Sequence, residues 1–473
     1  MKKIAQLQAL LQLPSTWLAR HPRVRIWLNV LRLGLFQFGM GLSLAPLTGT
    51  LNRVLIDEVG IPAVAVGFLI SIHYFVSPVR AMIGFRSDQD RIEGRWRTPY
   101  VVLGAMLTYG GLATAPFSLI LLSGEGVLPF PLAMGICTLI FLAYGIGVNT
   151  VETIYLALVS DLTPPGERGR VLAVLWIMLV LGTIVSSLIM GQLLQSYNHL
   201  RLIQVMQGSA SVFIGLTLLA LLNQEKLRPD GKVVAYTDDV RLRLSFGQSL
   251  RLLAHQPSLR SLFGILFVAT TGFATHDVLL EPYGGQVLHM PIAQTTQLTA
   301  LWGLAMLCAI AVSGWLLWQG RSPVGLIIAG CLIGMLGFLI ISLTSNEALV
   351  GPFRIGVWLI GLGRGLFVVA SITLVMSLTD MGHAGLFLGL WGIMQAIAQG
   401  VGTIGGGLAR DLAQQFTGKV VLGYTFVYGT SLSLLLLSLI LLALLRLDRQ
   451  LQAGEARSPW QGLQDIPADQ IIY

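Results

Sequence analysis

The chain has 473 residues, of which 54% are hydrophobic and only 11% charged, with a formal net charge of +8. A soluble domain carries about 25% charged residues, so this composition excludes one and indicates an integral protein of the lipid bilayer. The basic excess does not indicate nucleic-acid binding, because the basic residues lie in loops between apolar runs. The three cysteines form no CxxC pair, so neither a disulfide framework nor a zinc site is predicted.

Twelve apolar runs are long enough to cross a bilayer, whose core of about 30 Å requires roughly 20 helical residues. Runs of this length exclude barrel strands, and only the α-helix then satisfies the backbone in lipid. In chain order the runs are 28–50, 62–83, 99–123, 131–160, 171–194, 202–223, 258–280, 294–319, 323–343, 350–378, 385–409 and 420–445. The predicted fold class is therefore an all-α integral membrane protein with twelve transmembrane helices.

The longest polar interruption follows the sixth run and divides the chain into two halves. GIGVNTVETIYLALVSDLT (145–163) in the first half resembles GLGRGLFVVASITLVMSLT (361–379) in the second at a constant offset of 216. Two parallel, pseudo-symmetric six-helix halves characterise the major facilitator fold, in which substrate is handled near the midplane. The predicted parts are an N-terminal arm (1–27), a first bundle (28–223), a cytoplasmic linker (224–257), a second bundle (258–446) and a tail (447–473).

The basic residues predict the orientation. With both termini in the cytoplasm, the cytoplasmic segments carry 21 Lys and Arg residues and the opposite loops carry five. The positive-inside rule therefore places the N- and C-termini in the cytoplasm. The first 27 residues lack an apolar core followed by a small-residue cleavage site, so no signal peptide is predicted there.

The second run and the loop after it each contain a candidate for function. His73 lies in the middle of the second run, where it is either a packed, hydrogen-bonded side chain or a metal ligand. The loop 84–98 follows and contains Gly84, Arg86 and Asp88. Its acid and arginines can pair with helix ends and lock a cytoplasmic gate, although a plain positive-inside loop has the same composition.

Glu152 and Arg364 lie in equivalent helices of the two halves. Glu152 is nine residues from Asp161, and Arg364 is ten residues past Arg354, so both lie roughly 14–15 Å deep. A buried charge requires a partner, and we expect these two side chains to face one another across a central cavity. Such a pair is either a structural link between the halves or a functional site, with Glu152 coupling protons or Arg364 binding an anion.

The stretch THDVLLEPYGG (275–285) combines polar, acidic and helix-breaking residues at the end of the seventh run: His276, Asp277, Glu281, Pro282, Gly284 and Gly285. Proline and the glycines are predicted to end the helix abruptly. The two acids then lie at the non-cytoplasmic mouth between the halves. Arg53, at the corresponding end of the first helix, is expected to bridge to Glu281 or Asp277 and join the halves.

Four segments together carry a family resemblance: LTGTLNRVLIDEVGIPA (47–63), PVRAMIGFRSDQD (78–90), RWRTPYVVLG (95–104) and DVLLEPYGGQVL (277–288). They resemble the PucC-type branch of the major facilitator superfamily, called the bacteriochlorophyll delivery family. The loop GFRSD keeps Gly84 and Asp88 of the general superfamily loop but lacks its usual DR pair. The resemblance implies a multi-pass protein of an inner or photosynthetic membrane, thylakoid or intracytoplasmic, that is not an enzyme.

The resemblance also implies a role and a ligand. The protein is expected to help assemble light-harvesting or photosystem membrane subunits by binding or delivering chlorophyll or bacteriochlorophyll. The candidate pigment-binding residues are Glu152, Arg364, His73, His276, Asp277 and Glu281, with no metal beyond the pigment magnesium. Two alternatives stay open: a proton-coupled transporter of an organic solute that uses Glu152, and a pigment-free membrane scaffold.

Overall fold

The computed structural model describes residues 22–78, 80, 97–124, 128–163, 168–222, 224, 257–344, 349–377 and 384–444. Within these ranges the regular elements are helices, and no strand occurs among them. The loop residues Gly84, Arg86 and Asp88 lie outside the described residues. The same holds for most of the arm and linker and for the whole tail, so the predictions made for them stay predictions.

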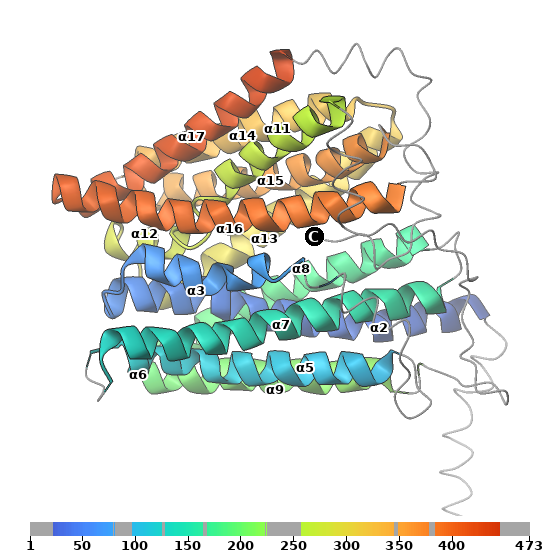
Figure 1. Cartoon of the computed structure of the whole chain (residues 1–473), viewed down its shortest axis with the longest axis horizontal. Coiled ribbons are helices and arrows are strands. Elements are labelled where there is room, and N and C mark those ends of the chain that lie inside the picture. The colour runs from blue at the N-terminus through green and yellow to red at the C-terminus, as the bar shows by residue number, and fades with distance from the viewer. Residues whose placement is uncertain are drawn as a thin grey trace, which may run out of the picture.

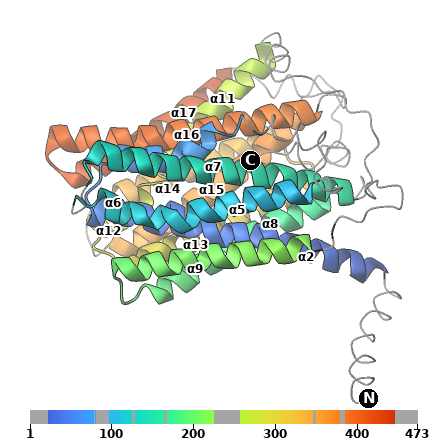
Figure 2. The same ribbon diagram turned by 60° about the horizontal axis from the view of Figure 1, so that its bottom comes forward.

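The first half contains the helices that the first six apolar runs predict. They are α2 (Pro22–Ala45), the π-helical η1 (Pro46–Leu51) and η2 (Val54–Glu58), α3 (Ala63–Phe75), α5 (Thr98–Thr114), the 3₁₀ turn η3 (Ala115–Phe117), α6 (Ser118–Leu122), α7 (Phe130–Leu162), α8 (Arg168–Leu193) and α9 (His199–Leu221). Figure 2 shows α5 beside α7 and α9, with which it packs.

The second half repeats this plan. Its elements are α11 (Pro257–Ala274), α12 (Leu280–Gln286), α13 (Ile292–Trp318), α14 (Pro323–Ser342), α15 (Val350–Ser377), α16 (Ala384–Thr417) and α17 (Val420–Leu444). Among the described residues, nine helices are long and apolar enough to cross a membrane, and α3 and α11 are shorter apolar helices. The all-α membrane fold is thereby confirmed, while the count of twelve spans stays a prediction.

The two halves form two bundles that lie against each other. Figure 1 shows the first bundle, blue to green, below the second, yellow to red. Two helix pairs make most of the contact between them: α3 packs on α16, and α8 packs on α13. The space between the two halves is therefore lined by side chains from both of them.

The first helix of each half is interrupted, and a proline lies at the interruption in the first half and shortly after it in the second. Pro46 begins η1, and because proline has no N–H, the carbonyl of Leu42 receives no bond from that position. Ser186 Oγ on α8 donates to this carbonyl at 2.7 Å. Pro282 likewise leaves the carbonyl of Val278 open, and Asn52 Nδ2 of the first half donates to it at 3.3 Å. Each interruption is thus satisfied by a side chain from another helix.

The predicted end of the seventh helix was wrong. The helix ends at Ala274, a turn follows over 275–279, and Pro282, Gly284 and Gly285 lie inside the short helix α12. Proline is tolerated in the first turn of a helix, because the N–H it lacks would have no partner within the helix there. Pro282 therefore starts a second helical segment and does not stop the first.

Candidate functional site

A cavity of about 550 Å³ lies between the two bundles. This volume falls in the range of roughly 300–1,000 Å³ that is typical of ligand pockets. Most of the lining surface is apolar, and polar and charged side chains from both halves also reach it. All six side chains predicted to bind a cofactor line this one cavity: His73, Glu152, His276, Asp277, Glu281 and Arg364. The structure thus brings together residues that are distant in the sequence.

Glu152 forms an ion pair within the first half. Its Oε2 accepts a hydrogen bond from Arg80 Nη2 at 2.8 Å, and both side chains are buried. Arg80 Nε also donates to Asn149 Oδ1, one turn from Glu152 on α7, at 2.5 Å. Glu152 and Arg364 both line the cavity, but the expected pairing between them was wrong, because an arginine of its own bundle neutralises Glu152. The only sequence signal for Arg80 was a charge inside an apolar run.

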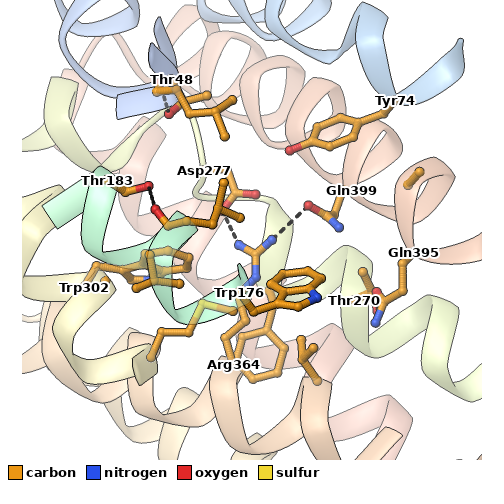
Figure 3. Close-up of a pocket in the computed structure, with 18 of the residues that line it drawn as sticks. Thr48, Tyr74, Trp176, Thr183, Thr270, Asp277, Trp302, Arg364, Gln395 and Gln399 are labelled. Carbon is orange, nitrogen blue, oxygen red and sulfur yellow. Dashed lines mark hydrogen bonds and ion pairs between the residues drawn. The ribbon is translucent and has the colours of Figure 1, made fainter. Parts of the chain in front are cut away.

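Arg364 on α15 is neutralised within the second half. Its Nη1 donates to Asp277 Oδ1 at 2.6 Å, and its Nη2 donates to Gln399 Oε1 at 3.1 Å. The guanidinium lies over the ring of Trp302, 5.5 Å from the centroid, where a cation–π interaction adds to its binding. Figure 3 shows this group projecting into the cavity near Trp176. The turn over 275–279 is what brings the Asp277 carboxylate to it.

Glu281 on α12 is buried beside the first half. Its Oε1 accepts from Thr299 Oγ1 at 2.7 Å, and its Oε2 has no hydrogen-bond partner in the described part of the chain. A Cβ at Gly49 would lie 2.1 Å from Oε1, so a larger residue at that position would require this carboxyl group to shift. Among the described residues no arginine or lysine lies within ion-pair distance of Glu281.

Arg53 joins the halves in a different way from the one predicted. The expected bridge to Glu281 or Asp277 was wrong: Arg53 pairs with Asp57, one turn along its own segment, at 3.1 Å. The same Nη2 atom donates to the carbonyl of Met290 in the second half at 3.0 Å. A neighbour at i+4 is within reach without any rearrangement of the backbone, which explains why it takes the arginine.

Further hydrogen bonds fasten the halves at this end of the bundle, and we call the set the clasp. It consists of Arg53 to the Met290 carbonyl (3.0 Å), Thr50 with Thr296 (3.0 Å), Asn52 to the Val278 carbonyl (3.3 Å), Gln286 to the Ile56 carbonyl (3.3 Å) and the Val64 N–H to Asp411 (2.8 Å). The predicted orientation places the clasp on the non-cytoplasmic side. It links the two bundles at one end of the space between them.

The two cavity histidines differ in their surroundings. His276 is 2% exposed, its Nε2 lies 4.0 Å from Asp277 Oδ1, and its ring meets Phe338 edge-on at 5.1 Å. His73 is half-buried, and its Nδ1 lies 2.6 Å from the carbonyl oxygen of Ile70. No group of three or more His, Cys, Asp or Glu side chains suited to a free metal ion occurs in the described part of the chain.

Two helical bundles around a central cavity define a major facilitator fold, and solved structures confirm it. A mutant of the nucleoside transporter NupG has a TM-score of 0.67 at 12% identity, over 87% of this chain and 99% of the transporter. A bacterial homologue of the human lysosomal transporter Spinster, inward-facing and occupied, has a TM-score of 0.66 at 13% identity, over 92% and 99% of the two chains. At these identities the likeness is one of fold.

The chain belongs to the PUCC protein family, whose model matches residues 50–449. The uncharacterized protein in the puhA-bchM intergenic region of Rhodobacter capsulatus is 38% identical, over 93% of this chain and 94% of its own. Protein PucC of Rhodovulum sulfidophilum is 37% identical, over 81% and 85%. The bacteriochlorophyll synthase 44.5 kDa chain of Rhodobacter capsulatus is 32% identical, over 82% and 89%. The predicted family is therefore confirmed.

Proposed function

We propose that this protein is an assembly factor of a photosynthetic membrane. It binds chlorophyll or bacteriochlorophyll in the central cavity and delivers it to light-harvesting or photosystem membrane subunits. The observation that carries the proposal is the cavity itself, because most of its surface is apolar and two of its carboxylates, Glu152 and Asp277, are already paired with arginines. The proposal assigns binding and delivery to the chain, and no catalytic step.

The neutralised charges favour a large apolar ligand. Glu152 is paired with Arg80, and Asp277 with Arg364, so an ionic solute would have to break a pair to be bound. Flat indole surface is available from Trp176 and Trp302 on opposite halves. A chlorin ring is flat and mostly apolar, and it requires one ligand for its magnesium. The relative named as a bacteriochlorophyll synthase chain supports the same class of ligand.

The first experiment is an absorption spectrum and pigment extract of the protein, gently purified from its native host. Co-purifying subunits are identified by mass spectrometry in the same sample. Pigment at a stoichiometric level together with photosynthetic subunits is the expected result. Subunits without pigment would replace the proposal with a pigment-free scaffold. A folded preparation with neither would rule out both roles.

A proton-coupled transporter of an organic solute is the second candidate. The observation in its favour is the clasp, a set of single hydrogen bonds that links the two halves at one end and that two rocking bundles can break. Glu152 is then the proton carrier. Uptake by proteoliposomes under a proton gradient tests this function, and Glu152→Gln is expected to abolish it. Unchanged uptake in that variant would remove Glu152 from the mechanism.

A further inference from the structure

We propose that His73 is the axial ligand of the pigment's magnesium, bound through its Nε2 atom. This inference rests on the proposed function and assigns a specific contact to it. Three observations carry it: the hydrogen bond of the imidazole ring, the fixed position of the ring on the cavity wall, and the different surroundings of the other candidate ligands.

The hydrogen bond of the ring determines which nitrogen can bind a metal. His73 Nδ1 lies 2.6 Å from the carbonyl oxygen of Ile70. A carbonyl oxygen only accepts, so Nδ1 must carry the proton, and in the neutral ring the lone pair lies on Nε2. Histidines that bind metals show the same arrangement, because donating the second N–H to a carbonyl fixes the tautomer and makes the ligand nitrogen more basic.

The position of His73 is fixed from two sides. Asn149 Nδ2 donates to the backbone carbonyl of His73 at 2.8 Å. Gly145 lets α7 approach closely, since a Cβ there would lie 2.8 Å from the Cα of His73. The imidazole packs against the ring of Tyr74 with 3.8 Å between centroids. A ligand atom held in this way loses little freedom when a metal binds.

His73 Nε2 is available for binding. Within the described part of the chain it makes no hydrogen bond, and the half-buried side chain lines the cavity. Neutral imidazole is a common metal ligand in proteins. A single nitrogen at the wall of an apolar cavity is what a flat magnesium ring needs, because the ring itself supplies the other four ligands.

The other candidates are less suited to the role. His276 is only 2% exposed and Glu281 only 3%, so a macrocycle has little access to either side chain. Glu152 is buried in its ion pair with Arg80. Asp277 is the strongest competitor, since its side chain is 23% exposed and its charge is neutralised by Arg364. The experiment therefore has to separate His73 from Asp277.

The test compares two pigments that differ only in the metal. Bacteriochlorophyll a and its magnesium-free form, bacteriopheophytin a, are titrated into the purified full chain in detergent, and binding is followed by tryptophan quenching. His73→Leu is expected to weaken binding of the magnesium pigment by at least about tenfold. Its affinity for the magnesium-free pigment should not change. Resonance Raman bands that report the coordination of magnesium should shift in this variant.

One matched variant and a rescue complete the design. His276→Leu removes the other cavity imidazole and is expected to leave the magnesium bands unchanged. His73→Ala with added imidazole should recover the wild-type bands, which a loss of structure could not do. If His73→Leu lost both pigments, this rescue would decide: recovery supports the ligand role, and failure overturns it.

The two levels of the proposal fail in different ways. A wild-type protein that binds neither pigment overturns the proposed function and this inference with it. A wild-type protein that binds bacteriochlorophyll with the same bands in His73→Leu overturns the ligand role of His73 alone. If instead Asp277→Asn shifts the bands and His73→Leu does not, the axial ligand is Asp277.

Discussion

At the scale of single residues, three acidic side chains of this protein find cationic partners within their own half. Arg80 pairs with Glu152, Arg97 pairs with Asp161 at 2.6 Å, and Asp277 is bound by the arginine of α15. A buried charge left without a partner is costly, so each pair stabilises its own bundle. The bundles can therefore rotate against each other without separating these ion pairs.

We expect Arg364→Met to lower the free energy of unfolding by about 2 kcal/mol, because Asp277 keeps its charge and loses its cation. The loss stays below that of a fully buried pair, since Asp277 is partly exposed to the cavity. Urea unfolding in detergent, followed by tryptophan fluorescence, measures it. The double variant Asp277→Asn/Arg364→Met should recover part of the loss. Equal losses in the single and double variants would show that the pair does not couple the two side chains.

Sequence reasoning predicted the depth of these side chains but not their partners. Counting residues from the helix ends placed Glu152 and Arg364 at the same level, and both line the cavity. A rise of 1.5 Å per residue gives depth, whereas the direction of a side chain depends on how each helix is rotated in its bundle. For that reason Arg80 and Asp277 could not be assigned as partners from the sequence.

At the scale of elements, each apolar run predicts a helix, and the irregular segments escape prediction. The π-helical segment η1 begins at Pro46, inside the run 28–50, and the turn 275–279 lies inside the run 258–280, and both runs read as continuous helix. Their sequences, LAPLTG (44–49) and LEPYGG (280–285), share leucine, proline and glycine at the same spacing. A proline accompanies each interruption. Pro282 lies after the turn, whereas Pro46 lies where the α-helix changes to a π-helix.

A close helix contact allows a sharp test of packing. On α16, a Cβ at Gly406 would lie 1.9 Å from the backbone carbonyl oxygen of Thr275, whereas Gly405 has nothing within 4 Å. Gly406→Ala must move backbone and is expected to destabilise the protein by about 1–3 kcal/mol. Gly405→Ala should be neutral or stabilise by up to about 1 kcal/mol, since alanine favours the helix. Melting temperatures in detergent compare the two, and equal values would contradict the contact.

At the scale of the whole molecule, two halves enclose a central cavity, and the clasp links the halves at one end. The split of six plus six runs and the internal repeat predicted this arrangement, which the likeness to solved major facilitator structures confirms. The contacts of the clasp could not be predicted, because they join segments of different halves, whose relative positions depend on the packing of both bundles. The orientation of the termini stays a prediction from the basic residues.

A disulfide across the clasp separates delivery from transport. The hydroxyl oxygens of Thr50 and Thr296 are 3.0 Å apart, so Thr50→Cys/Thr296→Cys should form a disulfide on oxidation. If pigment enters and leaves at the end opposite the clasp, the oxidised protein should still support assembly of light-harvesting complexes. The level of complex is measured by absorption of membranes, with each single variant as a control. Loss of assembly that a reductant reverses would mean that the clasp has to open.

The two proline interruptions also bear on the order in which the protein is built. The open carbonyl of Leu42 is satisfied by Ser186, within the first half, whereas that of Val278 is satisfied by Asn52 from the other half. The first half can therefore form the hydrogen bond to its open carbonyl as soon as it leaves the ribosome. The second half can form the corresponding bond only after it docks onto the first. Expressed alone, the second half should be degraded faster than the first, and co-expression should protect it. Pulse-chase labelling of the separate halves would reveal this dependence.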